Sequence, residues 1–436
     1  MAAFGKSKFS LVPPPNPFVQ IDAYIDQLPP NIPKLEDISI FKPTKYLEPG
    51  AYGKAYANET HVMKIIDLEY QIKITRHNSY PELIEKITSS IQSEIVHYYA
   101  ISEICPNVCK LLGYAYDSAK HKLYIHMENC GTDLFDVYGS DQSPETTRDY
   151  IGQIINAIDC LHKHGYVHRD LKTENITVTR EGTVQLIDFG MARRDGDVAY
   201  PLGTPGYTSP ENMRPGQPTF DMLKASDIWS LGVTFMFMLL PNALRKVRPE
   251  LTNEMMDEIV DKLFVNYKPD EEINKPDEEI NKPHKKPNTH LTFVQRIETL
   301  FTPKESISIM TMCYKEIINI FGLSATWESF FSDDWTKRAS AEQLKAWFDT
   351  KTAELAAMSS ITLKRTRESQ FSPQKILRTK SAGGKSRRKK RGSSATLPIN
   401  KLKGNPPTAD CPISNLHRST PAKNHSAYKK TRSSRK

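Results

Sequence analysis

Cysteine is sparse in this chain of 436 residues and follows no recognisable spacing. The six cysteines form no CxxC pair and have no companion histidine pattern: Cys105, Cys109, Cys130, Cys160, Cys313 and Cys411. Zinc modules and disulfide frameworks depend on such spacing, so this distribution argues against both. We expect a reducing compartment.

Long apolar runs are missing as well. The longest, Val233 to Leu240, stops at Pro241, far short of the roughly 20 residues that span a bilayer. The first ten residues, MAAFGKSKFS, lack the apolar centre of a secretory signal. We therefore expect a soluble, intracellular protein that contacts no membrane.

Acidic residues are nearly missing from the last part of the chain. From Ile361 onward there are 21 Lys and Arg but only two acidic residues, Glu368 and Asp410, which gives a net charge of +19. The residues before Ile361 carry 38 basic and 49 acidic side chains. An acidic body of net charge −11 thus precedes a strongly basic tail, and we expect the two to have different roles.

Composition divides the chain further. Residues 1–40 are rich in proline, which favours extended polyproline conformation over helix, so we expect an arm packed on the body or trailing from it. Residues 41–130 combine short β-like runs with one amphipathic helical stretch, Leu83 to Ile104, where apolar residues recur every three or four positions. Residues 131–350 have mainly helical patterns, with a hairpin pattern in NITVTREGTVQLIDFG.

Two segments are predicted to be disordered. Residues 266–290 contain the repeat KPDEEIN twice, and its period of seven would suit a coiled coil. Each unit has one apolar residue and a helix-breaking proline, however, so an acidic Lys-Pro insertion without fixed structure is the preferred interpretation. Residues 351–436 are rich in Ser, Thr, Lys, Arg and Pro, and we expect a basic disordered tail.

The strongest local pattern is HRDLKTEN at residues 168–175, followed thirteen residues later by DFG. Asp170 can orient an attacking hydroxyl and accept its proton, and Lys172 can neutralise phosphate charge. Asn175 and Asp188 supply the hard oxygen ligands that magnesium prefers. Phosphoryl transfer needs this combination of metal ligands, a cation and a nucleophile aligner. The two strings resemble the catalytic loop and the metal-binding loop of eukaryotic protein kinases.

The resemblance implies an ATP-anchoring lysine on a strand and a glutamate partner on the helix of the small lobe. Lys64, in the string VMK, occupies the lysine position. Glu94 fits the family spacing best as its partner. Glu85 and Glu103 lie on the same predicted helix and stay open as alternatives.

The string EPGAYGKAY at residues 48–56 is similar to the family's glycine-rich loop in Gly50 and Gly53, its second and third glycines. Such glycines let the backbone fold closely over phosphates. Glu48 stands where the first glycine is usual, which leaves the turn at Gly50 but puts nucleotide affinity and loop closure in question.

The string LYIHMENCGTDLF is similar to the strand and linker between the two lobes of a kinase, where backbone groups hold the adenine. By this resemblance Met127 would line the back of the adenine pocket, and Glu128 to Cys130 would form the linker. Asp133 would bind the ribose. Taken alone, Met127 would be an ordinary core residue.

The string GTPGYTSPE looks like the substrate-docking end of an activation segment. In Ser/Thr kinases the threonine here, Thr204, bonds the catalytic aspartate and lysine, and together with HRDLK it implies Ser/Thr specificity. Glu211 needs a buried positive partner, and Arg338 occupies the family's position for it. Asp227 is placed to hold the backbone of the catalytic loop from a buried helix.

Arg169 precedes the catalytic aspartate, which in the family often implies pairing with a phosphate in the activation segment. The usual phosphothreonine position is taken by Tyr200, and acidic residues, Asp195 and Asp197, lie nearby. Our hypothesis is that activity needs no Ser/Thr phosphorylation there.

The string KSRRKKRGSS at residues 385–394 is typical of nuclear import signals, and the whole tail could contact phosphates of DNA or RNA without reading sequence. Only Phe371 and Tyr428 offer rings, too few for base stacking. A merely solubilising tail is the alternative.

The resemblance covers about Lys45 to Phe348. It implies an α+β, bilobal kinase fold, with a small antiparallel β lobe containing one main helix and a larger, mainly α lobe. It also implies a Ser/Thr protein kinase that uses ATP and Mg²⁺ on protein substrates. The sequence does not define the oligomeric state, for which we expect a monomer, and the basic tail favours the nucleus over the cytoplasm and basic or nuclear substrates. The unusual insertions and the altered glycine-rich loop suggest a divergent lineage, such as that of a large DNA virus.

Two other functions stay open: a pseudokinase scaffold that transfers no phosphate, and a kinase of small molecules. Degenerate scaffolds commonly lack at least one of four residues that are all present here: Lys64, Asp170, Asn175 and Asp188. The SPE string and Arg338 favour a protein substrate, because in the family they build the peptide-docking floor.

Overall fold

The computed structural model describes residues 16–50, 53–75, 77, 79–138, 142–200, 203–214, 216–260, 262–263 and 293–370. The predicted insertion at residues 266–290 and the tail beyond residue 370 lie outside the described residues. The glycine-rich segment is described on either side of residues 51 and 52.

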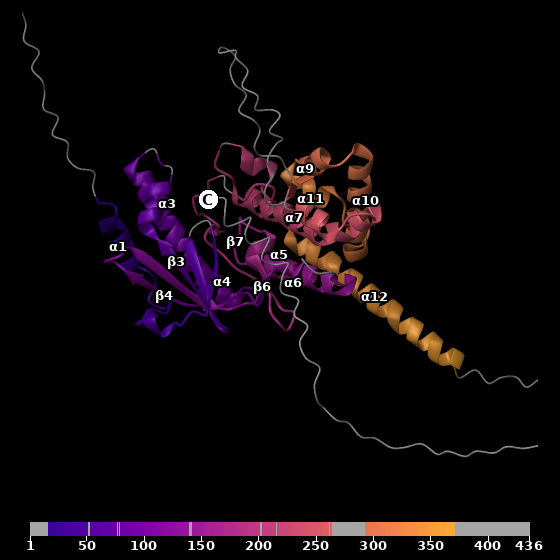
Figure 1. The fold of residues 1–436 in the computed structure, drawn as a ribbon, viewed down its shortest axis with the longest axis horizontal. Coiled ribbons are helices and arrows are strands. Elements are labelled where there is room, and N and C mark those ends of the chain that lie inside the picture. The colour runs from indigo at the N-terminus through magenta and orange to yellow at the C-terminus, as the bar shows by residue number, and fades with distance from the viewer. Residues whose placement is uncertain are drawn as a thin grey trace, which may run out of the picture. The chain divides into compact units, whose positions relative to one another are not determined.

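The first part of the described chain is built on a five-stranded antiparallel sheet, part of which is labelled in Figure 1. Its order is β1-β2-β3-β5-β4, with bounds Lys45–Gly50, Gly53–Ala57, His61–Asp67, Lys122–Glu128 and Leu111–Asp117 in that order. Alternate residues of β5 are buried, as expected for a sheet covered on one face. Lys64 lies in the central strand, between Ala55 of β2 and Ile125 of β5.

A long helical stretch packs with this sheet. It consists of α3 (Tyr80–Ile91), a π-helical turn η2 (Gln92–His97) and α4 (Tyr98–Ile104), preceded by the short helix α2 (Leu68–Ile74). The Ser79 side chain caps the start of α3 by accepting from the Glu82 N–H. Buried residues recur every fourth position: Leu83, Ile87, Ile91 and Ile95. The π turn carries Glu94, and such turns are frequent at functional sites.

The N-terminal arm packs on the sheet, but its predicted polyproline conformation is wrong for residues 18–26. These form helix α1 (Phe18–Asp26), because the prolines flank this segment without entering it. Tyr116 of β4 donates a hydrogen bond to Asp22 at 2.5 Å, and the ring of Phe18 stacks on His121 at 3.5 Å. A 3₁₀ turn, η1 (Ile38–Ile40), leads into β1.

The second part is mainly helical. Its helices are α5 (Leu134–Val137), α6 (Pro144–Lys163), α7 (Phe220–Val247), α8 (Asn253–Val260), α9 (Phe293–Leu300), α10 (Pro303–Phe321), α11 (Glu328–Phe331) and α12 (Ala341–Gln370). Short strands form a sheet of order β6-β8-β9 (Thr132–Asp133, Ile176–Val178, Val184–Leu186) and the pair β7 and β10 (Tyr166–Val167, Arg193–Arg194). The described residues of this part also contain the 3₁₀ turns η3 (Thr173–Asn175), η4 (Pro210–Met213) and η7 (Trp335–Lys337). The predicted bilobal α+β fold class is confirmed.

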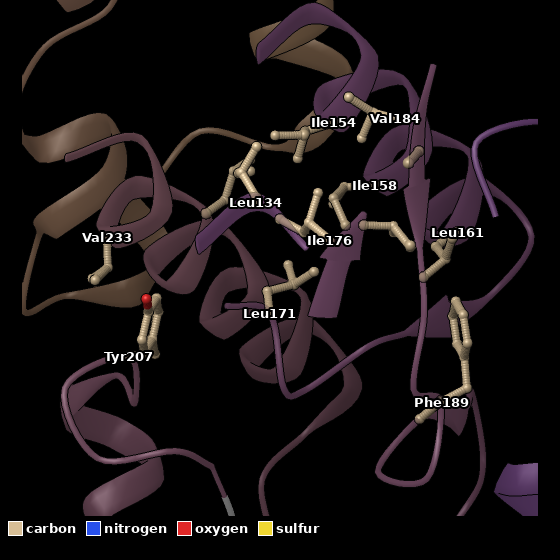
Figure 2. Close-up of a cluster of buried hydrophobic side chains, with 14 of the residues drawn as sticks. Leu134, Ile154, Ile158, Leu161, Leu171, Ile176, Val184, Phe189, Tyr207 and Val233 are labelled. Atoms are coloured by element: carbon tan, nitrogen blue, oxygen red, sulfur yellow. The ribbon is translucent and has the colours of Figure 1, made fainter. Parts of the chain in front are cut away.

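The core of this part fixes the loops that carry the charged residues. Ile154 and Ile158 of α6 pack with Ile176 of β8 and Val184 of β9 (Figure 2). The predicted hairpin NITVTREGTVQLIDFG is the pair β8 and β9, with Ile176 opposite Leu186. Residues 168–175 therefore lead into β8 and residues 188–190 follow β9, so one buried hairpin positions both segments.

Helix α7 is the central buried helix. It continues through Pro241, so the apolar run that ends there in the sequence does not end the helix. It is the one helix of the described residues that is long and apolar enough to cross a membrane, but 94% of its apolar window is buried inside the protein. We interpret it as a core helix.

Helix α12 continues past residue 350 to Gln370, where a disordered tail was predicted from residue 351. The segment KTAELAAMSS contains strong helix formers, and its exposed Thr and Ser side chains bond backward to backbone carbonyls, as Thr352 does to Phe348. Overall composition concealed this local helix propensity.

The prediction that argues against disulfides is wrong. Cys105 pairs with Cys160, and Cys109 pairs with Cys130. The partners are 55 and 21 residues apart and lie on different elements, so only the fold brings them together. Among the described residues Cys313 is the free cysteine, and burial raises its pKa to about 12.

Candidate active site

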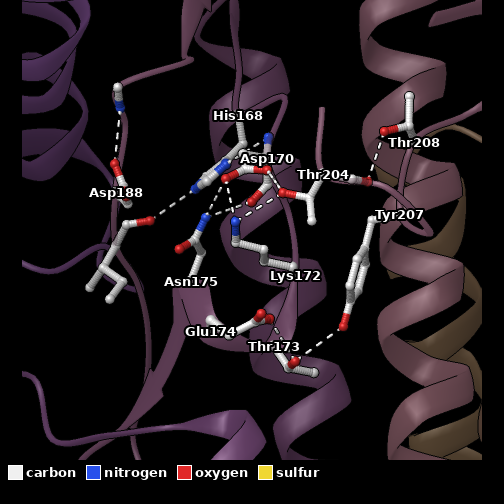
Figure 3. Close-up of polar contacts among 12 residues, drawn as sticks. His168, Asp170, Lys172, Thr173, Glu174, Asn175, Asp188, Thr204, Tyr207 and Thr208 are labelled. Atoms are coloured by element: carbon white, nitrogen blue, oxygen red, sulfur yellow. Dashed lines mark hydrogen bonds and ion pairs between the residues drawn. The ribbon is translucent and has the colours of Figure 1, made fainter. Parts of the chain in front are cut away.

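The carboxylate of Asp170 is the centre of a hydrogen-bonded cluster (Figure 3). Thr204 donates to its Oδ1 at 2.6 Å, and Asn175 donates to its Oδ2 at 2.9 Å. Lys172 Nζ lies 2.9 Å from the same Oδ2 and donates to Thr204 Oγ1 at 2.9 Å. Three residues from two segments, Thr204, Asn175 and Lys172, thus fix the direction in which Asp170 points.

The backbone beneath this cluster is strained and supported. Arg169 and Asp188 have positive φ angles of 69° and 61°, which non-glycine residues rarely adopt. Asp227 of α7 accepts hydrogen bonds from the backbone N–H groups of His168 at 2.9 Å and Arg169 at 2.8 Å. His162 Nε2 lies 3.1 Å from the same carboxylate. Asp227 therefore holds the backbone of residues 168 and 169 from helix α7, the role that the sequence resemblance implies for it.

Lys64 bridges the sheet, the helix and the second loop. Its Nζ lies 2.5 Å from Glu94 Oε1 and 2.8 Å from Asp188 Oδ1. The structure therefore places Glu94 against Lys64, whereas Glu85 is exposed and Glu103 pairs with Lys110 at 2.7 Å.

The charges at this bridge support one another. Burial alone would lower the pKa of Lys64, but the carboxylates of Asp188 and Glu94 outweigh it and raise that pKa. Removal from water would raise the pKa of Asp188, yet Lys64 prevails and lowers it to about 2. Burial raises the pKa of Glu94, and Lys64 offsets this only in part. Lys64 and Asp188 therefore stay ionised at neutral pH.

The oxygen donors that could hold a divalent cation come from Asn175 and Asp188. The Asn175 amide nitrogen is turned toward Asp170, donating to its backbone carbonyl at 2.8 Å and to its carboxylate at 2.9 Å. That orientation directs the amide oxygen away from Asp170 and makes it the available ligand atom. The Asp188 side chain remains 32% exposed while one oxygen bonds Lys64. A carboxylate and an amide oxygen form a donor set that suits Mg²⁺.

The glycines of the glycine-rich segment meet across a hairpin. Gly50 ends β1 and lies opposite Gly53, which begins β2. A Cβ atom on Gly53 would stand 2.5 Å from the Ile65 carbonyl oxygen, so the close approach of β2 and β3 requires glycine there.

The end of β5 and the linker after it contain the residues expected near adenine. Met127 is buried, and its sulfur accepts a hydrogen bond from Tyr98 Oη at 3.8 Å. The Glu128 N–H donates to the Lys110 carbonyl at 3.0 Å, while Cys130 lies in the disulfide with Cys109.

Asp133, which the sequence assigns to a ribose, caps helix α5 in this structure by accepting from the Asp136 N–H at 2.8 Å. Two residues, Gly131 and Thr132, separate the linker from this cap, so helix α5 begins shortly after the linker.

The expected docking floor is a buried ion pair. Arg338 donates to both oxygens of Glu211, at 2.7 and 2.8 Å, and also to the carbonyls of Ser332 and Ala225. Its guanidinium lies over the ring of Trp229, 4.9 Å from the ring centre. The side chains are 0% and 4% exposed, so each is the other's required partner.

A set of contacts between the activation segment and the helix was not found from the sequence. His97 Nε2 lies 3.4 Å from Asp197 Oδ2, and Arg193 donates to Ser93 Oγ at 2.6 Å. His97 follows Glu94 by three positions, which would put both on one face of the α-helix that the sequence predicts. That spacing was the available signal.

Arg169 completes this anchoring with backbone partners. It donates to the carbonyl of Met191 at 3.3 Å and to that of Tyr200. The expectation that Arg169 faces the activation segment therefore has a geometric basis without any phosphate.

Comparison with known proteins agrees with this geometry. The chain is 33% identical over 230 residues to CBL-interacting serine/threonine-protein kinase 26 of Arabidopsis thaliana, covering 49% of this chain and 48% of that protein. It is 30% identical over 224 residues to the cAMP-dependent protein kinase catalytic subunit of Dictyostelium discoideum, covering 49% and 31%. It is 32% identical over 216 residues to the human hormonally up-regulated neu tumor-associated kinase, covering 48% and 26%.

The matched region thus spans about half or less of these relatives' length. The family model of the protein kinase domain matches residues 46–346, well over half of the chain. These residues contain every charged group of the site described above, and the chain belongs to the protein kinase family.

Proposed function

We propose that this chain transfers the γ-phosphate of ATP to serine or threonine hydroxyls of proteins. The observation that carries the proposal is the Asp170 cluster, in which Thr204 and Lys172 hold the carboxylate. A threonine that bridges the aspartate and the lysine of HRDLK is the arrangement that the sequence resemblance associates with Ser/Thr specificity. Lys64 also contacts Glu94, so the lysine proposed to hold the ATP phosphates is positioned in the same structure as the Asp170 cluster.

The residues would divide the work as follows. Asp170 would accept a hydrogen bond from the substrate hydroxyl and take its proton as the new bond forms. Lys172, already 2.9 Å from Asp170, would stabilise negative charge that develops on the transferred group. Burial alone would lower the pKa of Lys172, but Asp170 raises it overall, so the ammonium stays charged.

ATP and Mg²⁺ are the cofactors that the site fits. Lys64 would hold phosphate oxygens, and Asn175 and Asp188 would hold the metal ion. When bound, magnesium ATP supplies the phosphoryl group and neutralises its charge. The linker backbone at Glu128 to Cys130 would bind the adenine next to Met127.

The test is transfer of labelled γ-phosphate to basic proteins and to the chain itself, with the full chain and its Asp170→Ala variant. We expect labelled serine and threonine with the wild type and a loss of at least about 100-fold with Asp170→Ala. ATP binding with no transfer by the wild type would instead support a pseudokinase scaffold that transfers no phosphate.

The scaffold alternative is not favoured, because the four residues that such scaffolds commonly lose are present and meet in the structure. Lys64 contacts Asp188, and Asp170 contacts Asn175. The buried pair of Glu211 and Arg338 favours a protein substrate over a small molecule, because it supports the segment on which a peptide would dock.

We also propose that the basic tail directs the kinase to the nucleus or to nucleic acid. The support is its composition: a net charge of +19 from Ile361 onward and the cluster KSRRKKRGSS. A chain that ends after Gln370 retains helix α12 and removes the cluster. We expect it to lose nuclear accumulation and salt-dependent binding to duplex DNA, and unchanged behaviour in both assays would contradict this role.

A further inference from the structure

In the linker between the sheet and the helical part, Cys130 is a buried residue whose backbone has no partner among the described residues. Cys130 is 7% exposed, and within the described part of the chain no hydrogen bond involves its N–H or its carbonyl. Buried backbone groups of this kind normally have a partner. A donor and an acceptor on one residue match the edge of a purine base, which offers both in adjacent positions.

Hydrogen bonds hold Asn129, the residue before Cys130, to one neighbouring segment. Asn129 donates from its backbone to Thr60 at 2.8 Å and from its side chain to Asn58 at 2.7 Å. These bonds tie the linker to the turn before β3. The disulfide to Cys109 ties it from the opposite side, and Cys109 Sγ lies 3.3 Å from the Glu128 carbonyl oxygen.

Cys109 is itself held by the strand that leads to Asp188. Its N–H donates to the Leu186 carbonyl, and the Leu186 N–H donates to the Asn107 carbonyl, both at 2.9 Å. The Asn107 side chain donates to the Val184 carbonyl at 2.9 Å. Through Cys109 the disulfide therefore connects the linker to Leu186 of β9. Leu186 lies two residues before Asp188, the aspartate proposed to bind the metal.

We propose that Cys109 is a redox-dependent positioning residue, and that its disulfide with Cys130 sets the affinity of this kinase for adenine nucleotides. The inference rests on the proposed function, since it concerns the same nucleotide site. With the bond formed, the Cys130 N–H and carbonyl are held in place from both sides. With the bond broken, one of the two supports is lost and binding must order the linker.

The bond would form by exchange with a small-molecule disulfide such as oxidised glutathione. One cysteine thiolate attacks the glutathione disulfide, releasing one glutathione thiolate and forming a mixed disulfide. The second cysteine then attacks the sulfur of the first and releases the second glutathione. The two cysteine protons end on the two glutathione thiols, so one oxidised glutathione yields one protein disulfide and two reduced glutathiones.

The second disulfide serves as an internal control. Cys105 joins Cys160 of helix α6, and neither cysteine belongs to the linker Glu128 to Cys130. Cys160 is partly exposed, with the His164 ring nitrogen 3.7 Å from its sulfur, whereas Cys105, Cys109 and Cys130 are all buried. Mild reductant should therefore open the Cys105–Cys160 bond first.

The experiment uses the full chain carrying Cys411→Ser, so that the tail cysteine takes no part in exchange. Three proteins are compared: this background, the background with Cys109→Ser and Cys130→Ser, and the background with Cys105→Ser and Cys160→Ser. Each is incubated with oxidised glutathione or with dithiothreitol. The Kd for magnesium ATP is measured by calorimetry, KM for ATP and kcat by phosphate transfer, and the bonds by alkylation and peptide mapping.

We expect reduction to raise the Kd and KM for ATP about two- to tenfold in the background, because ordering a loosened segment costs that much in affinity. The kcat should change less than about twofold, because the linker does not touch the transferred group. The Cys109/Cys130 variant should behave like the reduced background in both conditions. The Cys105/Cys160 variant should keep the full redox response.

An unchanged Kd in the background, with mapping that shows the Cys109–Cys130 bond open, would overturn the inference. So would free Cys109 and Cys130 thiols after oxidation. Since the background protein tests the effect without any substitution at these positions, poor folding of a variant does not remove the test. Redox-dependent ATP binding without phosphate transfer would contradict the proposed function and leave this inference intact.

Discussion

Gly190 and Glu94 approach so closely that no side chain fits between them. A Cβ atom on Gly190 would stand 2.5 Å from Glu94 Oε1 and 3.1 Å from its carboxylate carbon. Glu94 is held there by Lys64, so the glycine after Asp188 and Phe189 permits the contact that joins helix and sheet.

Gly190→Ala should therefore weaken activity by displacing Glu94 or Asp188 from Lys64. We expect kcat/KM to fall about 10- to 100-fold, since displacements near 1 Å in such sites have costs of this order. Gly182→Ala is the control, because a Cβ there meets nothing within 4 Å. Its positive φ of 82° should reduce stability by about 1 kcal/mol without changing kcat/KM. Equal kinetics for both variants would refute the steric argument.

Thr204→Val should lower kcat with little change in KM for ATP. The valine keeps the shape but removes the hydroxyl that donates to Asp170 and accepts from Lys172. We expect a loss of about 10- to 100-fold in kcat, because Asp170 loses its orientation. Thr204→Ser retains the hydroxyl and should recover most of the activity. A serine variant as impaired as the valine variant would show that the methyl group, not the hydroxyl, matters.

Stability should fall as the pH drops below the pKa of an unfolded histidine, in part because of His97. Burial lowers the pKa of His97 in the folded protein, although Asp197 acts to raise it and Arg193 and Arg194 act with burial. The unfolded chain therefore binds a proton on His97 more readily than the folded chain does. The contribution of neutral His97 to the stability of the fold is complete above about pH 6.5 and is lost below it.

The measurement is the thermal midpoint of the wild type and of His97→Gln between pH 5.5 and 8. We expect the wild type to lose more stability across this range than the variant, by at most about 1.4 kcal/mol per pH unit. Parallel curves would show that His97 does not titrate differently on folding.

Removing the buried cation of the Glu211 pair should destabilise the whole domain. Arg338→Ala leaves a carboxylate that is 4% exposed without its partner, which costs about 3–5 kcal/mol. The matched control is Arg248→Ala, because Arg248 pairs with Glu305 at 2.7 Å with side chains 30% and 24% exposed. That loss should stay near or below about 1 kcal/mol. Urea unfolding measures both, and equal losses would contradict the role of burial.

The sequence was sufficient wherever a local string defines the position of a residue. HRDLKTEN places Asp170, Lys172 and Asn175 on one turn, and the hairpin pattern that follows brings Asp188 beside them. Glu94 was preferred over its two alternatives by spacing, and the π-helical turn is what directs it to Lys64.

The rest depended on contacts between distant segments. Spacing says nothing about cysteines that lie 55 residues apart, because their pairing needs the end of α4 to meet helix α6. Helix α1 was missed because its prolines lie outside it, and composition averaged over forty residues hides that boundary. The helix in residues 351–370 was missed for the same reason, since basic and Ser-rich composition was taken for the whole tail.

Activity should not depend on phosphorylation of the activation segment. Arg169, the residue that would bind such a phosphate, donates to the carbonyls of Met191 and Tyr200. The carboxylate of Asp197 lies 3.4 Å from His97, and so provides a fixed negative charge toward the helix. The segment is therefore held by groups that are always present.

Treatment of the purified full chain with a Ser/Thr phosphatase should change kcat less than about twofold, whereas Asp197→Asn, which removes the fixed charge, should lower it severalfold. Asp195→Asn is the matched control, because Asp195 lies in the same segment and its N–H bonds to the Gly165 carbonyl independently of its side chain. If phosphatase abolishes activity and mass spectrometry maps the lost phosphate to residues 191–208, then Arg169 must exchange its carbonyl partners for a phosphate, and the contacts seen here describe the state before activation.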